Sequence, residues 1–560
     1  MILDYVGTTF TAKVGVRDHL AMKRIPGTRH KAKADLWLVP ATWPAMLQMA
    51  SIFGNEIEAT ATARTEALRL QHQAKHRHCR ASHLHKGLMD PRLYPFQQDG
   101  VSFLRWGSSL LGDEMGLGKT VQALQATMGP ALVVTTNSMT HKWASECAEW
   151  GGTLEPLVLE GGPKARAEIF EQVGDRTLLI MNWEKLILHS RQAAFGSVGA
   201  KPGKDESLNE FTWATTIADE AHRAKDPMSQ QTRALWAVGQ CSDRRIAMTG
   251  TPMADSPDDL WSIMHFVSPE EWPTRGKFRE RYCEMRDNGF GIENVGIRRE
   301  MMAEFDAIFQ PRFLRRTKTE VLPDLPDKTF VTVPLEMAPK QKAAYKSMAE
   351  EFIALIDGDL LVATDILSQL GRLRQLASAT PVIEDGEVVA MGAPSNKLDA
   401  LEDILSEKRG VVVFAESRKL IEFIGSELEK KKGGKKARPP YKVGYITGAY
   451  GAAMRQRYVD AFQAGELDVM LCTMAGKEGV TLTRADTLVY VQLPQSNIDY
   501  LQSQDRIHRI GQESNVTVII LSSEGTADET VAANLERKND RLQQVVRDNA
   551  RVALYGGSDF

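Results

Sequence analysis

Cysteine is scarce in this chain, and long apolar runs are missing. Only five of the 560 residues are cysteine, and they lie far apart with no Cys-x-x-Cys pair. A disulfide framework and a zinc ribbon both need closely spaced cysteines, so this spacing disfavours both and predicts a reducing compartment. No stretch of about 18 apolar residues is present, and no basic region of the kind that begins a signal peptide opens the chain. We therefore expect a soluble, unexported, cytoplasmic protein that does not enter a membrane.

A large net charge of either sign is also missing. Lys and Arg number 69 and Asp and Glu number 72, and the formal charge of −3 does not indicate a nucleic-acid binder. The balance is uneven, however, because the first 100 residues hold 14 basic and 8 acidic side chains. Further basic clusters lie at 312–318 and 430–442. The pattern predicts an acidic body that carries local cationic surfaces, so the overall charge neither supports nor excludes a nucleic-acid partner.

Histidine is concentrated in one basic segment at 69–86. It contains His72, His76, His78, His83 and His85. Two of these, His72 and His76, are one helical turn apart with Cys79 nearby, so a metal site is one interpretation. No zinc-finger spacing appears, and a basic face that contacts phosphate is the other interpretation.

Short β-rich apolar runs alternate with helical stretches from about residue 91 onward, which is typical of βαβ units around a parallel sheet. The first series of predicted strands lies at 109–112, 131–136, 177–182, 215–219 and 245–250. The second series lies at 410–417, 441–448, 467–473, 487–493 and 516–521. Two such series predict an α/β protein with two lobes in tandem.

Four regions follow from this pattern. They are an N-terminal accessory module at 1–88, a first lobe at 89–310, a helical bridge and insertion at 311–395, and a second lobe with a C-terminal helix at 396–560. The bridge is expected because apolar positions recur at helical spacing within 336–380. The lysine-rich tract at 430–440 is broken by glycine and proline, so we expect a loop there between a helix and a strand.

The segment GDEMGLGKT, at 112–120, joins a predicted strand to a predicted helix. A glycine-containing turn in this place presents backbone N–H groups and a helix N-terminus to phosphate. Lys119 would reach the β- and γ-phosphates of ATP, and the Thr120 hydroxyl would bind Mg²⁺. The pattern GxxxxGK[ST] fails at its first position, where Asp113 stands, so an ordinary strand-to-helix turn remains the alternative. The predicted cofactors are ATP and Mg²⁺, and the predicted nucleotide-binding residues of this turn are Asp113, Gly116, Leu117, Gly118, Lys119 and Thr120.

A later apolar run, TTIADEAH at 215–222, ends in adjacent carboxylates. On a strand end beside the phosphate turn, Asp219 can hold the Mg²⁺ shell while Glu220 polarises the attacking water. An acidic helix N-terminus would favour the same residues for electrostatic reasons alone. The phosphate turn upstream favours the catalytic interpretation.

Two further motifs complete the candidate site. MTGTP, at 248–252, places Thr249 and Thr251 after a predicted strand, where they could sense the γ-phosphate, although TGTP alone predicts only a turn. QSQDRIHRIGQ, at 502–512, spaces Arg506 and Arg509 three residues apart on an expected helical face. If the two lobes close over ATP, both arginines can act on the transferring phosphoryl group. A surface helix with ion pairs is the alternative.

Together with two further motifs, LYPFQQDG at 93–100 and RFLRRTKTEVLPDLPDK at 312–328, these motifs form an ordered set along the chain. The ordered set spans about residues 90–520 and resembles the SWI/SNF-type branch of the superfamily-two helicase-like ATPases. The form DEMGLGKT, with Asp113 in place of glycine, is the form of the phosphate-turn motif that this branch has. The resemblance implies two RecA-like parallel-sheet lobes in tandem, with a small N-terminal accessory domain and helical insertions. It also implies that the lobes clamp double-stranded DNA and translocate along one strand with ATP.

The resemblance assigns roles to matching positions. Lys119, Thr120, Asp219 and Glu220 would act in catalysis, Arg506 and Arg509 as arginine fingers, Gln97 at adenine and Gln504 in the cleft between the lobes. The residues implied in coupling nucleotide to DNA are Thr249, Thr251, Thr473 and Gly479. In the coupling segment at 475–486, Lys477 and Thr481 depart from the family pattern. The segment at 132–143 looks like the first DNA-contacting motif without its usual proline, and we expect Trp143 to pack in the core.

The segment at 9–43 is similar to an accessory module that precedes the motor in annealing-helicase relatives. The shared residues are IPG at 25–27 and W-x-V-P at 37–40. This similarity would place a basic set on a DNA-facing surface, namely Arg24, Arg29, His30, Lys31 and Lys33. A small β-rich cap is the alternative.

We therefore predict an enzyme, a DNA-dependent ATP hydrolase that translocates on double-stranded DNA without sequence preference. Fork remodelling and strand annealing are its candidate tasks. The alternatives are a strand-separating DNA or RNA helicase and an ATP-gated remodeller of a DNA-bound protein complex. The sequence shows no histone-reading appendage, so we expect a minimal motor of bacterial or viral origin, or a nuclear protein if the source is eukaryotic.

Overall fold

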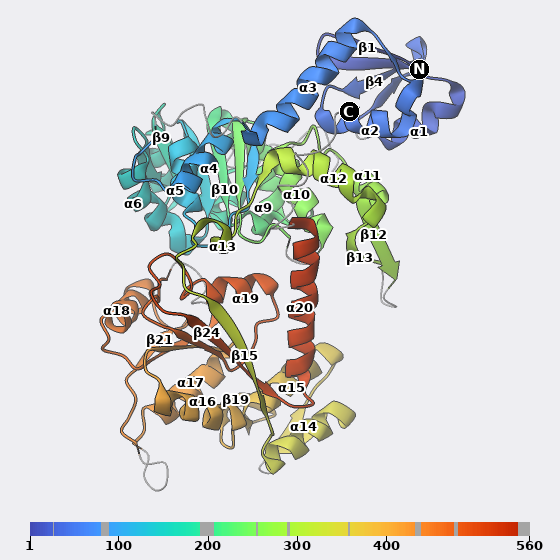
Figure 1. The fold of residues 1–560 in the computed structure, drawn as a ribbon. Coiled ribbons are helices and arrows are strands. Elements are labelled where there is room, and N and C mark those ends of the chain that lie inside the picture. Colours follow the sequence, from blue (N-terminus) through green and yellow to red (C-terminus); the bar gives the residue numbers. More distant parts are fainter. Residues whose placement is uncertain are drawn as a thin grey trace. The chain divides into compact units, whose positions relative to one another are not determined.

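The computed structural model describes residues 1–25, 27–79, 89–190, 207–253, 256–287, 292–356, 359–431, 438–474 and 480–546. The chain forms two compact units whose main boundary falls between residues 321 and 322. Each unit is built on its own parallel sheet (Figure 1), so the predicted α/β class with two RecA-like lobes is confirmed. Among the described helices, none has the length and hydropathy that a membrane span needs.

The first unit contains a seven-stranded sheet in the order β14-β6-β11-β10-β7-β9-β8. Its strands are β6 (Ser109–Leu111), β7 (Ala131–Thr135), β8 (Glu155–Val158), β9 (Thr177–Asn182), β10 (Trp213–Asp219), β11 (Ser242–Met248) and β14 (Phe313–Leu314). All pairings in it are parallel. The five strands predicted in this region are present and are the interior strands of the sheet. β7 and β9 read as apolar runs because they are buried throughout.

In the sequence, helices lie before, between and after these strands. They are α4 (Pro95–Arg105), α5 (Lys119–Ala126), α6 (Thr140–Trp150), α7 (Pro163–Phe170), α8 (Trp183–His189), α9 (Gln230–Gly239), α10 (Pro257–Val267), α11 (Arg275–Tyr282), α12 (Met302–Phe309) and α13 (Lys318–Val321). A hairpin of β12 (Cys283–Asp287) and β13 (Ile292–Ile297) follows α11.

The second unit contains a six-stranded parallel sheet in the order β15-β24-β23-β20-β22-β21. Its strands are β15 (Lys328–Leu335), β20 (Val411–Phe414), β21 (Val443–Ile446), β22 (Val469–Cys472), β23 (Thr487–Tyr490) and β24 (Val516–Ser523). Its helices are α14 (Pro339–Glu351), α15 (Ile366–Ser378), α16 (Asn396–Glu407), α17 (Arg418–Leu428), α18 (Ala452–Gln463), α19 (Asn497–Gln504) and α20 (Ala527–Val546). All five strands predicted here are present.

The segment at 311–395 differs from the helical bridge that the sequence predicted. It adds the edge strand β14 to the first sheet and the edge strand β15 to the second. Around α14 and α15 it also forms two hairpins, β16 (Ile353–Ile356) with β17 (Asp359–Val362), and β18 (Thr380–Glu384) with β19 (Glu387–Gly392). β14 has only two residues and β15 is largely exposed, so neither carries the continuous apolar run of a central strand.

The expected loop at 430–440 is described only in part. The helix α17 precedes it and the strand β21 follows it, but residues 432–437 lie outside the described residues.

The N-terminal module is a five-stranded sheet in the order β3-β4-β2-β1-β5. Its elements are β1 (Ile2–Val6), β2 (Thr9–Lys13), α1 (His19–Arg24), β3 (Arg29–Lys31), β4 (Leu36–Pro40), α2 (Trp43–Phe53), β5 (Glu58–Ala59) and α3 (Ala61–Cys79). A core of its own includes the fully buried Phe10 and Val39. The module is therefore β-rich, with α2 and α3 packed beside the sheet.

Buried and partly buried hydrogen bonds join this module to the rest of the first unit. Gln48 Nε2 donates to the Tyr282 hydroxyl at 2.7 Å, and that hydroxyl donates to Glu304 Oε1 at 2.7 Å. Trp43 Nε1 donates to the Ala307 carbonyl at 3.1 Å. The module is thus attached through the α11 and α12 region.

The histidine-rich segment is described only at its beginning. His72 lies exposed on α3, whereas the side chains of His76, His78 and Cys79 are not described, and His83 and His85 lie outside the described residues. The interpretation of this segment as a metal site or a phosphate-contacting face stays a prediction.

Candidate nucleotide site

The phosphate turn follows β6 and ends at α5, as the sequence predicts. Gly116 and Gly118 have φ angles of 88° and 74°, in the left-handed region that favours glycine. A Cβ on Gly118 would also lie 2.5 Å from Gln97 Nε2, so space as well as conformation requires glycine here. Gly118 caps α5. The first N–H groups of that helix have no intrahelical acceptor and can donate to a phosphate.

Lys119 is the first residue of α5, and its side chain lies over the turn. Its Nζ donates to the Asp113 carbonyl at 2.8 Å and approaches the Glu114 carbonyl at 3.4 Å. A Cβ on Gly250, in the segment after β11, would lie 3.6 Å from the same nitrogen. The lysine ammonium therefore stands between two of the predicted motifs, where a phosphate oxygen would be a stronger acceptor than a carbonyl.

Asp219 ends β10 and is held by two donors from other elements. Thr135 Oγ1 and Trp143 Nε1 donate to its Oδ2 at 2.8 and 2.9 Å. Burial, and then the charge of Glu220, raise the pKa of Asp219 to about 6. A divalent cation beside it would favour the ionised form, so the carboxylate suits a Mg²⁺ shell. Trp143 is completely buried, as expected for a core residue.

Glu220 follows in the left-handed conformation, at φ 49°. His222 Nδ1 lies 3.2 Å from Glu220 Oε2 and 3.3 Å from Thr249 Oγ1. The Thr249 hydroxyl also accepts from the Thr251 backbone N–H at 3.1 Å. His222 thus links the carboxylate after β10 to the hydroxyl groups after β11, a connection that the sequence did not predict.

Gln97 lies on α4 beside the turn. Its Nε2 donates to the Leu117 carbonyl at 3.3 Å, and its Oε1 accepts from the Tyr94 backbone N–H at 3.1 Å. The side chain is buried. It therefore lies next to the phosphate turn, where the resemblance puts it, and its contact with adenine stays a prediction.

Arg316, just after β14, is the main residue of the site that the sequence analysis missed. Its Nε donates to Asp113 Oδ1 at 3.0 Å, and its Nη2 donates to Gln122 Oε1 at 2.7 Å. It also contacts the other Asp113 carboxylate oxygen and the Phe96 carbonyl. Asp113 has no exposed surface. Because a buried carboxylate needs a partner, Asp113 in place of glycine was the signal that could have pointed to an arginine.

Arg315 connects the same segment to two further motifs. Its Nη1 donates to the Gly112 and Gly250 carbonyls, each at 2.8 Å. The backbone N–H of Glu114 donates to the Arg316 carbonyl at 2.9 Å. The two arginines therefore fasten the phosphate turn, α4 and the segment after β11 to the stretch that leads into the second unit.

The predicted site residues of the second unit lie around α19 and β22. α19 ends at Gln504, so Arg506 and Arg509 do not share a helical face, and that prediction is wrong. The chain continues in turns, where Arg506 Nε donates to the Gln502 carbonyl at 3.1 Å and Arg509 Nη1 donates to Thr481 Oγ1 at 2.8 Å. The alternative of a surface helix does not apply to the two arginines either, because α19 ends before them.

Two other predicted residues of this unit have defined positions. Gln504 Oε1 accepts from Lys328 Nζ at 3.1 Å. Thr473 follows β22, and its backbone N–H donates to the Ile446 carbonyl at 3.1 Å. Gly479 and Lys477 lie outside the described residues.

Parallel-sheet lobes and a phosphate turn between β6 and α5 define a P-loop nucleotide-binding protein of the tandem RecA-like class. Within that class, the chain belongs to the SNF2-related domain family, whose profile matches residues 48–381. The profile of the helicase conserved C-terminal domain matches residues 396–511. The resemblance to SWI/SNF-type ATPases is confirmed.

Curated relatives match most of this chain. It is 25% identical to Nuclear protein STH1/NPS1 of Saccharomyces cerevisiae, over 79% of this chain and 33% of that protein. It is 26% identical to the ISWI chromatin-remodeling complex ATPase ISW1 of the same yeast, over 83% of this chain and 41% of that protein. Human Chromodomain-helicase-DNA-binding protein 1 is also 26% identical, over 81% of this chain and 26% of that protein.

Among solved structures, the chain is similar to the Sulfolobus solfataricus SWI2/SNF2 ATPase core in complex with dsDNA. The identity is 25%, the match covers 85% of this chain and 97% of that chain, and the TM-score is 0.39. The chain spans well under half the length of the three curated relatives named above. Those relatives are eukaryotic, so they give no support to the expected bacterial or viral origin.

Replacing Arg316 with methionine should destabilise the first unit strongly. The change leaves the Asp113 carboxylate buried without its cation, which costs roughly 3–5 kcal/mol of unfolding free energy. All ten tryptophans lie between residues 37 and 272, so tryptophan fluorescence during a urea titration reports the unfolding of this unit alone. The control is Arg299→Met, because Arg299 is exposed. Equal losses in the two variants would contradict the role given to Arg316.

Proposed function

We propose that this protein hydrolyses ATP and uses the energy to translocate on double-stranded DNA. One observation carries the hydrolytic part. Lys119, Asp219 with Glu220, and Thr249 come from three segments that follow the adjacent strands β6, β10 and β11. A phosphate cradle, a buried carboxylate and a second carboxylate at one edge of a sheet are what triphosphate hydrolysis requires.

In the proposed reaction, the turn and Lys119 bind the β- and γ-phosphates. Thr120 and Asp219 would hold Mg²⁺, which neutralises charge on the phosphate oxygens. Glu220 orients the attacking water and accepts its proton, and His222 holds Glu220 in position beside Thr249. Thr249 and Thr251 would then respond to the presence of the γ-phosphate.

Arg506 and Arg509 of the second unit are proposed to stabilise the charge of the transferring phosphoryl group. Gln504, Thr473 and Gly479 would take part in coupling the nucleotide state to DNA, and Gln97 would contact the adenine. These roles come from the family resemblance.

Double-stranded DNA is proposed as the partner because the family relatives carry names such as chromatin remodelling factor and chromodomain-helicase-DNA-binding protein. Exposed basic residues of the N-terminal module, Arg29, Lys31 and Lys33, supply cations for phosphate contacts. Fork remodelling and strand annealing are finer proposals for the same motor. The protein would work in the compartment that holds the DNA, which is the cytoplasm of a bacterial cell or the nucleus of a eukaryotic one.

Lys119→Ala should abolish ATP hydrolysis while DNA binding is kept, because in the proposed reaction the ammonium acts on the phosphates and takes no part in binding DNA. We expect turnover to fall by roughly a hundredfold or more in a phosphate-release assay. Fluorescence anisotropy with a labelled duplex should give an unchanged affinity. Lys164→Ala, at an exposed position on α7, is the control. Normal turnover by Lys119→Ala would refute the assignment of the site.

Arg509→Ala should slow hydrolysis by roughly a thousandfold with near-normal ATP affinity, as expected for an arginine finger. Thr481→Val is the matched control, since it removes the hydrogen bond to Arg509 but keeps the guanidinium. Single-turnover hydrolysis and nucleotide binding are measured on each variant. Rapid hydrolysis by Arg509→Ala would place the finger elsewhere, and equal loss in both variants would indicate a structural role.

Duplex DNA should stimulate ATP turnover more than single-stranded DNA or RNA does, and duplex affinity should fall steeply with salt and vary little with sequence. A triplex-displacement assay tests translocation directly, because only a moving protein strips a third strand ahead of it. Stimulation by single strands with strand separation would instead support a helicase. Duplex stimulation without triplex displacement would support an ATP-gated remodeller of a DNA-bound complex.

A further inference from the structure

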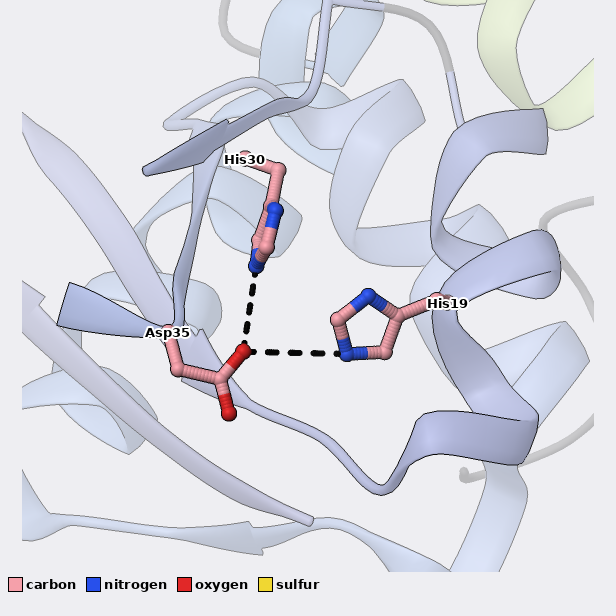
Figure 2. Close-up of side chains that lie close together, drawn as sticks. All are labelled: His19, His30 and Asp35. Carbon is pink, nitrogen blue, oxygen red and sulfur yellow. Dashed lines mark hydrogen bonds and ion pairs between the residues drawn. The ribbon is translucent and has the colours of Figure 1, made fainter. Parts of the chain in front are cut away.

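Two histidines and an aspartate of the N-terminal module converge on one point. His30 Nε2 lies 3.2 Å from Asp35 Oδ1, and His19 Nε2 lies 3.9 Å from the same oxygen. One ligand atom from each residue lies within 4.8 Å of the other two. Figure 2 shows both imidazole rings turning a nitrogen toward the carboxylate. The three residues come from α1, from β3 and from the residue that precedes β4.

Packing fixes the two rings in this arrangement. The His30 ring lies 4.9 Å from the ring of Trp37 at 32°, and the His19 ring meets the same indole edge-on at 5.6 Å. The two imidazoles contact each other at 4.8 Å. Trp37 is almost completely buried, so it is a rigid support. The rings therefore reach their positions without a ligand, which lowers the entropic cost of binding one.

We propose that His19, His30 and Asp35 form a binding site for a divalent transition metal ion of the zinc type. The ligands are the two Nε2 atoms and Asp35 Oδ1, and the remaining coordination positions face solvent because Asp35 is 71% exposed. Imidazole nitrogens with one carboxylate suit Zn²⁺, whereas Mg²⁺ prefers an all-oxygen set. Bond lengths of about 2.0–2.2 Å in a tetrahedron separate the ligand atoms by roughly 3.3–3.5 Å. The His30–Asp35 pair already has nearly that spacing, and His19 needs only a small movement.

The ion would act as a cross-link at the edge of the module's sheet where β3 carries Arg29 and Lys31. It would join α1, β3, which has only three residues, and the turn before β4. Side chains alternate along a strand, so Arg29 and Lys31 point away from the face that carries His30. A bound ion would thus fix β3 with these two cations presented on its other face. This inference concerns a site outside the nucleotide pocket and does not depend on ATP hydrolysis.

The test uses the full chain after treatment with a chelator. Calorimetric titration with ZnCl₂ measures stoichiometry and affinity, and the visible absorption of added Co²⁺ reports the ligand set. Asp35→Asn is the principal variant, because asparagine tolerates the left-handed conformation that Asp35 adopts at φ 46°. His30→Gln is the second variant. The control is the double change His72→Gln and His76→Gln, which alters the other histidine-rich segment.

We expect at least a tenfold weaker affinity for one equivalent of Zn²⁺ in Asp35→Asn and His30→Gln, and no change in the control. Zn²⁺ binding by Asp219→Asn should match that of the parent protein, which separates this site from the nucleotide site, where Asp219 is the carboxylate proposed to hold a metal ion. Tryptophan fluorescence checks that each variant is folded. If His30→Gln does not fold, the result for Asp35→Asn alone decides whether the proposal holds. Absence of Zn²⁺ binding by the parent, equal affinity in Asp35→Asn, or loss only in the control would each overturn the proposal.

Discussion

The buried ion pair between Asp113 and Arg316 is the contact on which the first unit depends. A carboxylate without exposed surface is tolerable only where a cation and hydrogen bonds compensate it, and Arg316 supplies both. The same guanidinium binds Gln122 of α5 and the carbonyl of Phe96 on α4. The phosphate turn is therefore held at Asp113 by the ion pair and at Leu117 by the hydrogen bond from Gln97. Its shape does not rely on the nucleotide alone.

The residues beside this ion pair also connect the motifs of the nucleotide site to one another. Arg315 reaches the carbonyls of Gly112 and Gly250, so the segment after β14 contacts both the start of the phosphate turn and the threonine motif. His222 adds a second connection, between Glu220 and Thr249. Under the proposed function, a change at the γ-phosphate would have short, hydrogen-bonded routes to the segment after β14. Such routes are the kind of physical path along which nucleotide state and motion can be coupled.

Sequence reasoning was most accurate where burial dictates composition. All ten predicted strands exist, and nine of them are interior strands of a parallel sheet, where burial on both faces favours apolar residues. Three of the four edge strands were missed, since β14 has only two residues and both β8 and β15 are largely exposed. Spacing alone also misplaced Arg506 and Arg509 on a helix, because nothing in DRIHR marks the end of α19 at Gln504. Lys119 and Asp219 were predictable from local motifs. The role of Arg316 was not, because it depends on a contact between segments that are distant in sequence. The convergence of His19, His30 and Asp35 was not predictable either, because it depends on turns that no motif encodes.

The distance in sequence between Asp113 and Arg316 has a consequence for biosynthesis. The two residues are 203 positions apart, so a ribosome that has just made the phosphate turn must add most of the remaining first unit before the partner cation exists. At about 5–20 residues per second, this takes on the order of 10–40 s. During that interval the edge of β6 lacks β14 and the Asp113 carboxylate lacks its guanidinium. The nascent unit is thus expected to stay incompletely folded, and a substrate for chaperones, until residues 313–316 have emerged.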